Sequence, residues 1–472
     1  MAGPVDFSDS LHGTIHLEEH ERKLVGSPWF QRLRRIHQLG SANMVFPGAE
    51  HTRFAHSLGV FHLASVIGKR FLDDKEIGEI EYRELRAAAL LHDIGHFPFS
   101  HTLESVYKGE WKKAEEARGE RTPLTSGVGT EGGQDTNAGK LKFHESFGKR
   151  VIEETESGGG IARILRDGGI VPERVGRIVV GQHENLLLNQ ILHSDLDVDQ
   201  LDYLLRDAKA TGSSYGLYDV NYLLQSLRVA KVEGSPVLCV HVSALHTLEH
   251  YVLARYFYYV CILYQKTRCV IEALLQEIAR RLIAMGHLPS WDSISSGFLE
   301  RSFCWFDDIA VVETMRRVVR ERLADEDLCK AIMILLDRDR ESLPRVICEE
   351  HVTDSNSEDF EPIFVQGEGN AVVRAALDNM STPEFAVLEQ CLPDGNNADV
   401  KKVLEVLTSD PEPIRIFETE PYTVPEGTPK VPATTRDGQS GHVLLLESLS
   451  NSLVGIGKLA GQRTRIVRHY HL

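Results

Sequence analysis

The sequence predicts a mostly α-helical protein, with a helical core over residues 1–288 and a smaller α+β region over residues 289–472. Within the core, apolar residues recur at intervals of three and four between short Gly, Pro or Asp breaks, the pattern of successive amphipathic helices. In the C-terminal region, helical patterns alternate with strand-like runs such as Pro344–Cys348 and Thr464–Arg468. A chain of 472 residues also exceeds the usual size of one hydrophobic core, so we expect two domains.

The periodicity assigns individual helices. In the core we expect them at Pro28–Leu39, Ser57–Phe71, Ile80–Asp93, His144–Glu154, Val171–His183, Asp197–Ala210 and Leu245–Met285. In the C-terminal region we expect helices at Val311–Leu323, Glu384–Gln390, Asp399–Leu407 and Leu446–Leu459, and a further strand at Ile414–Phe417. Residues 108–140 are rich in Gly, Thr, Lys and Glu. We expect a mobile insertion there, because loops of this length are usually lids or disordered segments.

Composition and charge disfavour several classes of protein. The net charge of -17 argues against nucleic-acid binding as the main role, because phosphate backbones attract basic surfaces. The seven cysteines show no Cys-x-x-Cys spacing and the N-terminus has no apolar signal core, which together indicate a reduced, cytoplasmic protein. Tyr251–Tyr264, the most apolar helical stretch, is shorter than the roughly 20 residues of a membrane span and contains Arg255, so no membrane segment is expected.

The most informative segment is His92–His101, which contains three imidazoles and a carboxylate. The His-Asp pair at its start ends an alanine-rich helical run. Such a pair of buried polar groups is costly unless it binds a metal ion or forms hydrogen bonds. A glycine and a proline then break the helix, so that His96 and His101 are expected on a turn over the same spot. The segment therefore predicts metal binding and proton transfer.

Two other segments supply matching groups. His51–Gly59 leads into a helix and contains His56, and its Arg53 suits a phosphate because a guanidinium is always charged. Asp197–Asp207 places four acids in an otherwise apolar helix, with Asp199 among them. Taken alone, His56 is more often an ordinary core or surface residue, and the acids could form a solvated face. Their combination with the His-Asp pair favours a metal site.

At this point the pattern resembles the HD superfamily of metal-dependent phosphohydrolases, whose ligands are a His, an adjacent His-Asp pair and a later Asp. The matching residues are His56, His92, Asp93 and Asp199. More specific runs look like the deoxynucleoside triphosphate triphosphohydrolase branch, which includes bacterial dGTPase-like proteins and is related to the vertebrate sterile-alpha-motif HD-domain enzyme. These runs are Phe30–Gly40, Val45–Ala49 and His51–Gly59, within a resemblance that covers roughly Leu11–Leu275.

The resemblance implies an HD-domain helical core with one divalent metal ion, whose identity among Mg, Mn, Fe, Zn and Ni is left open. It implies hydrolysis of a dNTP to a deoxynucleoside and inorganic triphosphate, by attack of metal-associated water at the α-phosphate. The base is left open, with dGTP one candidate for the preferred substrate. A homo-oligomer, either a dimer or a tetramer, is implied as well.

The resemblance also implies roles for individual side chains. His101 matches the proposed general acid for the departing 5′-oxygen, a task that suits an imidazole because its pKa is near neutral. His96 and His144 match histidines that line the phosphates and assist proton transfer, and Asp199 joins this catalytic group. The residues that match substrate-binding positions are Gln38, Leu39, Arg53, Tyr203, Asp207, Arg255, Tyr264 and Gln265.

These substrate-binding matches divide by the part of the nucleotide they contact. Arg53 and Arg255 match phosphate contacts, and Gln265 matches a residue near the base. Gln38, Tyr203 and Asp207 match groups around the 3′-hydroxyl. Tyr264 matches the tyrosine that stands where a 2′-hydroxyl would clash.

The sequence departs from the resemblance at two positions. Gly26 replaces an Asp that helps to read guanine in an activating site of the vertebrate enzyme, which makes nucleotide activation doubtful here. Gln200 replaces a Lys that contacts phosphate in that enzyme. Two alternatives therefore remain open: an HD-type phosphohydrolase or phosphodiesterase acting on another nucleotide or phosphate ester, with His96, His101 and His144 recruiting a second ion, and a nucleotide sensor with little turnover.

Overall fold

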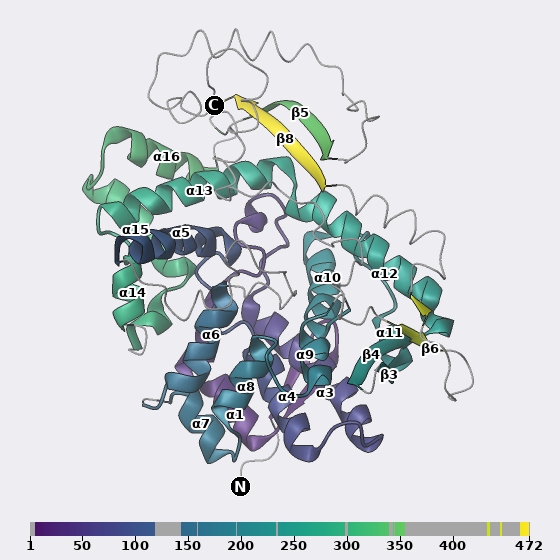
Figure 1. Cartoon of the computed structure of the whole chain (residues 1–472). Helices are drawn as coiled ribbons and strands as arrows, with labels where there is room; N and C mark the ends of the chain where they lie inside the picture. Colours follow the sequence, from purple (N-terminus) through teal and green to yellow (C-terminus); the bar gives the residue numbers. More distant parts are fainter. Residues whose placement is uncertain are drawn as a thin grey trace. The chain divides into compact units, whose positions relative to one another are not determined.

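The structure is a computed structural model, and it describes residues 5–118, 143–157, 159–194, 196–232, 235–297, 301–338, 343, 345–354, 432–434, 444–445 and 463–471 (Figure 1). The chain divides into two compact units. Unit 1 comprises residues 1–258, 289–311 and 424–453, and unit 2 comprises residues 259–288, 312–423 and 454–472.

Unit 1 is mostly helical, as the sequence predicts. Its helices are α1 (Glu19–Gly26), α2 (Pro28–Arg32), α3 (Arg53–Asp73), α4 (Glu79–Leu91), α5 (His101–Arg118), α6 (Phe143–Glu154), α7 (Ile161–Asp167), α8 (Pro172–Val179), α9 (Leu186–Leu192), α10 (Val198–Thr211), α11 (Val220–Ser226), α12 (Leu245–Tyr258) and α14 (Trp291–Gly297). Short 3₁₀ turns lie at Leu33–Arg35, Ala42–Met44, Val242–Ala244 and Arg301–Trp305. Its strands are β1 (Val5–Asp9), β2 (Gly13–Leu17), β3 (Leu227–Val232), β4 (Ser235–His241), β6 (Pro432–Thr434) and β7 (Leu444–Leu445).

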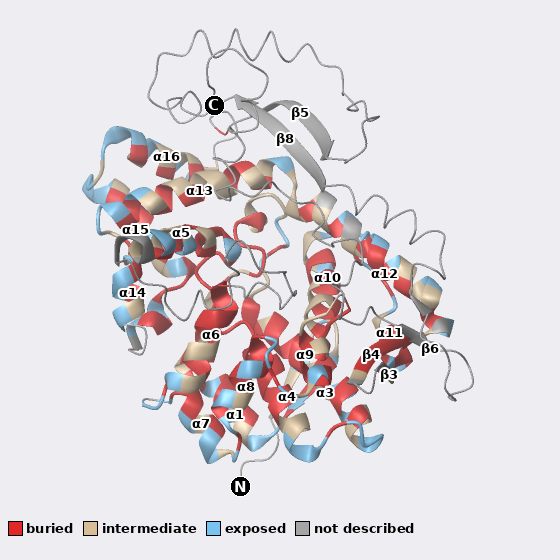
Figure 2. Ribbon diagram, viewed as in Figure 1, coloured by how far each residue is buried: buried red, intermediate tan, exposed pale blue. Residues whose placement is uncertain are grey.

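Helix α4 lies at the centre of unit 1. It packs against α3 on one side and α8 on another, and α3 also packs against α10. Its residues from Glu84 to Leu91 are all buried, which explains the alanine-rich composition, since small side chains allow neighbouring helices to approach closely. Buried residues, red in Figure 2, gather on α4 and the helices around it. The His-Asp pair follows this helix directly, so it emerges from the best-packed part of the unit.

Two helices that carry site residues begin at well-formed caps. At α10 the Asp197 side chain accepts a hydrogen bond from the Gln200 backbone N–H at 2.7 Å, as an N-cap does. The same helix ends at Gly212, whose φ of 73° favours glycine. At α4 the Glu81 side chain accepts a hydrogen bond from the Gly78 backbone N–H at 2.8 Å. These caps fix the ends of the helices around the site.

The strands of unit 1 form small sheets that the sequence patterns did not reveal. In unit 1, β1 pairs with β2 so that Phe7 lies opposite Ile15, and β3 pairs with β4. Strand β6 pairs in parallel with β4 and antiparallel with β7. The two hairpins were missed because their strands span only five to seven residues each.

Unit 2 combines helices with a two-stranded ribbon. Its elements are a π-helical turn at Tyr259–Leu263, α13 (Lys266–Ala284), α15 (Asp308–Glu321, whose first turn belongs to unit 1), α16 (Glu326–Asp337), β5 (Arg345–Asp354) and β8 (Arg463–His471). Helix α13 packs against α16, and β5 pairs antiparallel with β8. Both strands were expected, although each is longer than predicted. Among the described residues of the whole chain, no helix combines the length and apolarity needed to cross a membrane.

Two expected helices were predicted too long. The helix expected at Pro28–Leu39 ends at Arg32, because the chain then turns and the backbone N–H of Gln38 donates to the carbonyl of His51 at 3.0 Å. The helix expected at Leu245–Met285 is divided into α12 and α13. Gln265 separates them by capping α13, its side chain accepting from the Arg268 backbone N–H at 2.8 Å.

Other expectations fall partly or wholly outside the description. Helix α5 continues to Arg118, into the segment expected to form an insertion, and residues 119–142 lie outside the described residues. The expected C-terminal elements that also lie outside them are Glu384–Gln390, Asp399–Leu407, Ile414–Phe417 and Leu446–Leu459.

We predict that Phe97→Ala strongly destabilises the protein. Phe97 is fully buried, and its ring stacks on Tyr107 and Phe143 with centroids 5.1 and 5.6 Å apart. Removing a buried aromatic ring costs about 3–5 kcal/mol, so the midpoint of thermal unfolding should fall clearly. The control is Ile80→Ala, at a side chain that is 67% exposed, which should leave the midpoint nearly unchanged. Equal effects of the two variants would contradict the packing described.

We also predict a pH-dependent stabilisation by His37. The hydrogen bond to Asp308, at 2.7 Å, raises the pKa of His37, with burial opposing it and Glu50 adding a smaller effect. A raised histidine pKa stabilises the fold fully below the unfolded-state value of about 6.5, and this stabilisation is lost as pH rises through the folded-state pKa. The melting-temperature difference between wild type and His37→Gln should therefore be large in mild acid and small in alkali. A difference of the same size in mild acid and in alkali would contradict this role of His37.

Candidate active site

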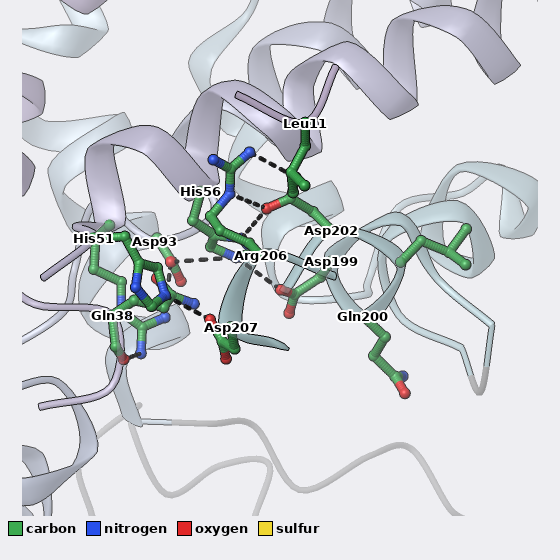
Figure 3. A network of polar contacts seen from close by, with 12 residues as sticks. Leu11, Gln38, His51, His56, Asp93, Asp199, Gln200, Asp202, Arg206 and Asp207 are labelled. Atoms are coloured by element: carbon green, nitrogen blue, oxygen red, sulfur yellow. Dashed lines mark hydrogen bonds and ion pairs between the residues drawn. The ribbon is translucent and has the colours of Figure 1, made fainter. Parts of the chain in front are cut away.

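The four residues expected as metal ligands come together in unit 1. His56 lies on α3, His92 and Asp93 follow the end of α4, and Asp199 lies in the first turn of α10. Figure 3 shows His56, Asp93 and Asp199 near one another. The Nε2 atom of His56 lies 3.3 Å from Nε2 of His92 and 2.9 Å from Oδ1 of Asp199. Asp93 places one oxygen 3.7 Å from His56 Nε2 and the other 3.4 Å from His92 Nε2.

This donor set fits a divalent cation. His56, His92 and Asp93 are buried and offer ligand atoms within 4.8 Å of one another. Oδ1 of Asp199 lies 2.9 Å from Nε2 of His56 and 3.8 Å from Nε2 of His92. Nitrogen and oxygen ligands of this kind suit Zn, Fe, Mn or Ni, and four protein ligands leave positions open for water and substrate. We call these four residues the HD centre.

Charge in the HD centre is balanced by basic groups. Burial opposes ionisation of Asp93, but Arg53, His92 and His96 outweigh it and hold its pKa well below the usual range. Arg53 donates to Asp93 at 2.8 Å. Burial likewise opposes a charge on His56, but the carboxylates around it raise its pKa to about 10. A metal ion would replace that proton as the positive charge between the carboxylates.

A residue that the sequence did not single out orients His56. The buried carboxylate of Asp202 accepts a hydrogen bond from His56 Nδ1 at 2.8 Å, which leaves Nε2 facing the HD centre (Figure 3). It also contacts His12 Nε2 at 2.6 Å and accepts from Arg206 at 2.7 Å. Asp202 approaches α3 closely at Gly59, where an added Cβ would lie 1.9 Å from its carboxylate oxygen. The sequence feature that could have identified Asp202 is its position among the four acids of one helix.

A second group of histidines lies beside the HD centre. The ring of His96 stacks on His144 with centroids 3.9 Å apart, and it lies 4.9 Å from the ring of His101. Nε2 of His96 also lies 3.1 Å from Asp93, which connects this group to the HD centre. The approach of α6 depends on Gly95, because an added Cβ would lie 2.2 Å from the carbonyl oxygen of His144. The sequence predicted these three histidines, and the structure brings them together.

Glu104 joins this group and was not predicted. Its buried carboxylate accepts from His101 Nδ1 at 2.8 Å and from His144 Nδ1 at 2.9 Å. Burial opposes its ionisation, but His144 and His101 outweigh it and hold the pKa of Glu104 well below the usual range. The Glu104 carboxylate can therefore accept a hydrogen bond from a protonated Nδ1 of His101 or of His144. Its spacing of three residues after His101 on a helix was a signal that could have identified it.

The turn that presents His101 has an unusual backbone. Phe99 and Ser100 both have φ of 54°, a conformation that costs about 1–3 kcal/mol for a non-glycine residue. Tertiary contacts hold it in place. The Phe99 backbone N–H donates to Asp308 at 2.6 Å, and the Ser100 hydroxyl donates to the carbonyl of His37 and accepts from Arg53. The turn leaves the His101 side chain 67% exposed while its neighbours are buried.

A third group of polar side chains lies on α10 and the segments near it. The buried carboxylate of Asp207 accepts a hydrogen bond from the Tyr258 hydroxyl at 2.7 Å and contacts His51 Nε2 at 2.6 Å. Tyr203 lies on the same helix, with its ring centroid 5.3 Å from that of Tyr258 and 6.5 Å from that of His56. Tyr203 therefore lies beside the HD centre, and Tyr258 contacts both Tyr203 and Asp207. The substrate-binding roles of Tyr203 and Asp207 stay predictions. Tyr258 and His51 were not predicted.

Other expected substrate-binding residues occupy less uniform positions. Gln38 and Leu39 are buried, and the Oε1 atom of Gln38 is buried without a hydrogen-bond partner, which is consistent with a group that awaits a ligand. Arg255 lies on α12 in unit 1. Tyr264 and Gln265 belong to unit 2, so their roles remain predictions.

The departure at Gln200 has a structural counterpart. Its amide donates to the carbonyl of Ser194 at 2.8 Å and to Asp197 at 3.1 Å, and its oxygen accepts from the Tyr251 hydroxyl. Figure 3 shows its side chain directed away from Asp199. Gln200 therefore serves the start of α10 and not the HD centre.

Comparison with known proteins shows what the site region resembles. The sequence model of the HD domain matches residues 53–207, a region that includes every residue of the HD centre. This part of the chain is therefore similar to an HD domain. The chain is 31% identical over 281 residues to the uncharacterized protein YwfO of Bacillus subtilis, a match that covers 58% of this chain and 55% of that protein.

Two vertebrate relatives carry a functional name. Deoxynucleoside triphosphate triphosphohydrolase SAMHD1 of Danio rerio is 30% identical over 246 residues, covering 49% of this chain and 38% of that protein. The human protein of the same name is 28% identical over 260 residues, covering 49% and 37%. The matched part of this chain thus covers 55% or less of the length of each of these three relatives. In structure, it resembles a hypothetical protein from Aquifex aeolicus solved at 2.0 Å resolution, with a TM-score of 0.56 and 28% identity over 81% of this chain and 84% of that one.

We predict that Asp202→Asn weakens metal binding at the HD centre. Loss of the carboxylate removes the group that orients His56, and such changes typically lower metal affinity by about 10- to 100-fold. The affinity can be measured by titrating metal-free protein with Mn²⁺ or Zn²⁺. Asp197→Asn, on the same helix, is the control, because Asn caps a helix as well as Asp does. Unchanged affinity in Asp202→Asn would contradict the positioning role.

Proposed function

We propose that this protein is a metal-dependent dNTP triphosphohydrolase that converts a dNTP to a deoxynucleoside and inorganic triphosphate. The observation that carries the proposal is the contact between the HD centre and the neighbouring histidines, which are His96, His101 and His144. Asp93 belongs to the HD centre and lies 3.1 Å from His96, whose ring is 4.9 Å from that of the exposed His101. His96 therefore links the proposed metal site to the proposed proton donor, and hydrolysis of a phosphate ester needs both groups near the scissile bond.

The residues of the HD centre would hold one divalent ion. When bound, such an ion lowers the pKa of a coordinated water and neutralises negative charge on a phosphate. Arg53, which donates to both Asp93 and the Ser100 hydroxyl, places a permanent positive charge between the HD centre and the turn before His101. We assign it to orient a phosphate, because a guanidinium matches phosphate oxygens in charge and shape.

His101 is assigned to donate the proton to the departing 5′-oxygen. Desolvation lowers the pKa of His101, and the pairing of its Nδ1 with Glu104 opposes that effect and leaves Nε2 available for the substrate. His96 and His144 would line the phosphates. Burial, followed by the charges of Arg53 and His144, holds the pKa of His96 well below its usual value, so His96 contacts phosphate as a neutral ring.

The Asp207 group is assigned to the sugar. A buried carboxylate with two partners in place is a rigid acceptor for a hydroxyl, and Tyr203 offers an aromatic face beside it. The similarity to two proteins named deoxynucleoside triphosphate triphosphohydrolase supports a deoxynucleotide as the substrate. We extend to this chain the homo-oligomeric assembly that the resemblance implies.

The proposal is tested by incubating the purified protein with each dNTP and rNTP, singly and mixed, with Mg²⁺ or Mn²⁺, and resolving the products by chromatography. We expect deoxynucleoside and triphosphate in equal amounts, and no product from the His92→Ala/Asp93→Ala variant. Turnover of single dNTPs would show that no second nucleotide is needed. Monophosphate or diphosphate products would reject the proposed bond cleavage, and binding without turnover would favour a nucleotide sensor.

We predict that His101→Asn lowers kcat by about 10²- to 10⁴-fold, the usual contribution of a general acid. The bound metal should be retained, because His101 is not a residue of the HD centre. His246→Asn is the matched control, since His246 is an exposed histidine that also pairs with a glutamate three residues later on a helix. Full activity of His101→Asn would reject the assignment of the proton donor.

A further inference from the structure

A second set of metal-ligand side chains lies outside the HD centre. His96, His101, Glu104 and His144 each offer one ligand atom, and these atoms all lie within 4.8 Å of one another. Three of the four residues are buried, and His101 is exposed at one side of the set. The set therefore has both the shielding of a metal site and a route for an ion to enter. We call it the His₃Glu cluster.

An independent observation indicates a missing ligand in this cluster. His96 is fully buried, yet neither of its ring nitrogens has a hydrogen-bond partner. Its Nε2 approaches Asp93 without hydrogen-bond geometry, and its Nδ1 lies 3.9 Å from Oε2 of Glu104, too far for a hydrogen bond. Buried polar atoms are rarely left without a partner, because their desolvation is not repaid. A cation at Nδ1 would supply that partner.

The spacing of the ligand atoms fits a four-coordinate ion. With bonds of about 2.0–2.1 Å, the ligand atoms of a tetrahedral zinc site lie roughly 3.4 Å apart. Oε2 of Glu104 lies 2.8 Å from His101 Nδ1 and 3.9 Å from His96 Nδ1, and its Oε1 lies 2.9 Å from His144 Nδ1. These distances from Glu104 to the histidines lie on both sides of the required value, and all four ligand atoms lie within 4.8 Å of one another, so small side-chain movements would bring them to a bound ion.

We propose that the His₃Glu cluster binds a second transition-metal ion of the zinc class, distinct from the ion of the HD centre, and that this ion inhibits turnover. Three imidazoles and one carboxylate favour Zn²⁺, Co²⁺ or Ni²⁺ over Mg²⁺, which prefers oxygen ligands. The inhibition, unlike the binding, rests on the proposed function of His101 as proton donor. A ring whose Nδ1 is bound to a metal keeps one proton on Nε2, and losing that proton would leave an imidazolate, so His101 stops acting as an acid.

Binding is tested without any measurement of activity. Metal-free protein is dialysed against buffered Zn²⁺ and the bound metal is counted by mass spectrometry. We expect two ions per chain for wild type, one for His92→Ala/Asp93→Ala, and one for His96→Asn/Glu104→Gln. The control His246→Asn/Glu249→Gln removes an exposed His-Glu pair of the same spacing and should retain two ions. Circular dichroism checks that each variant is folded.

The count has outcomes that overturn the proposal. If wild type binds only the ion that His92→Ala/Asp93→Ala loses, the His₃Glu cluster holds no metal. The same conclusion follows if His96→Asn/Glu104→Gln, in folded form, still binds two ions. A visible absorption band of four-coordinate Co²⁺ in His92→Ala/Asp93→Ala, absent when His96 and Glu104 are also replaced, would confirm the ligands.

Inhibition is tested separately on wild type loaded with Mn²⁺. Added Zn²⁺ should lower turnover in parallel with occupancy of the second site, by at least 10-fold at saturation, and a chelator should restore it. Two bound ions with unchanged turnover would reject the inhibitory role. Two bound ions in a protein that turns over no dNTP under any condition would reject the proposed function and leave the second metal site standing.

Discussion

The arrangement of the HD centre depends on the hydrogen bond between His56 and Asp202. These two residues are 146 positions apart in the sequence, and their hydrogen bond joins α3 to α10. It fixes which nitrogen of His56 faces the metal position, and it ties α10, with Asp199, to α3. Both partners are fully buried. A buried carboxylate is stable only when its charge is compensated, and here Arg206 supplies that compensation at 2.7 Å. The packing of α3 against α10 and the chemistry of the site therefore have the same cause.

The same network reaches the N-terminal hairpin. His12, in the turn between β1 and β2, contacts Asp202, and Asp9 accepts a hydrogen bond from Arg206 at 2.9 Å. Two groups of the hairpin thus complete the shell behind His56. A hairpin of two short strands is marginal by itself, so these buried polar contacts give it a defined position. In return, the hairpin excludes water from the carboxylate that orients the ligand.

Contacts from distant segments also stabilise the turn before His101. Two residues with positive φ are costly, and the cost is tolerated because Asp308 and Arg53 bind the backbone and side chain of that turn. Asp308 comes from a segment far along the chain and also pairs with His37. The geometry of His101, which we assign as the proton donor, thus depends on contacts with residues far from it in the sequence. The buried His96, with no hydrogen-bond partner, is where the same protein leaves a polar group uncompensated.

The sequence by itself determined the helical fold of the core and the chemistry of the site. Helical periodicity places α3, α4, α6 and α10 within a few residues of their observed bounds, because burial of one helix face requires that spacing. The HD centre, His96 and His101 followed from residue types and motif spacing, since few structures have a use for so many imidazoles and carboxylates in short segments. The role expected of His144 followed only from the resemblance to HD phosphohydrolases.

Only the tertiary structure decided which residues support those groups. The position of Asp202 among four acids and the spacing of Glu104 from His101 mark them as candidates, but only the structure shows that Asp202 meets His56 on α3 and that Glu104 meets His144 on α6. The close approaches at Gly59 and Gly95 likewise depend on helices that meet in space and not in sequence. The early end of the helix after Arg32 was decided by the pairing of Gln38 with His51. Local propensity sets what a segment can form, and contacts between distant segments decide where it stops and what its side chains do.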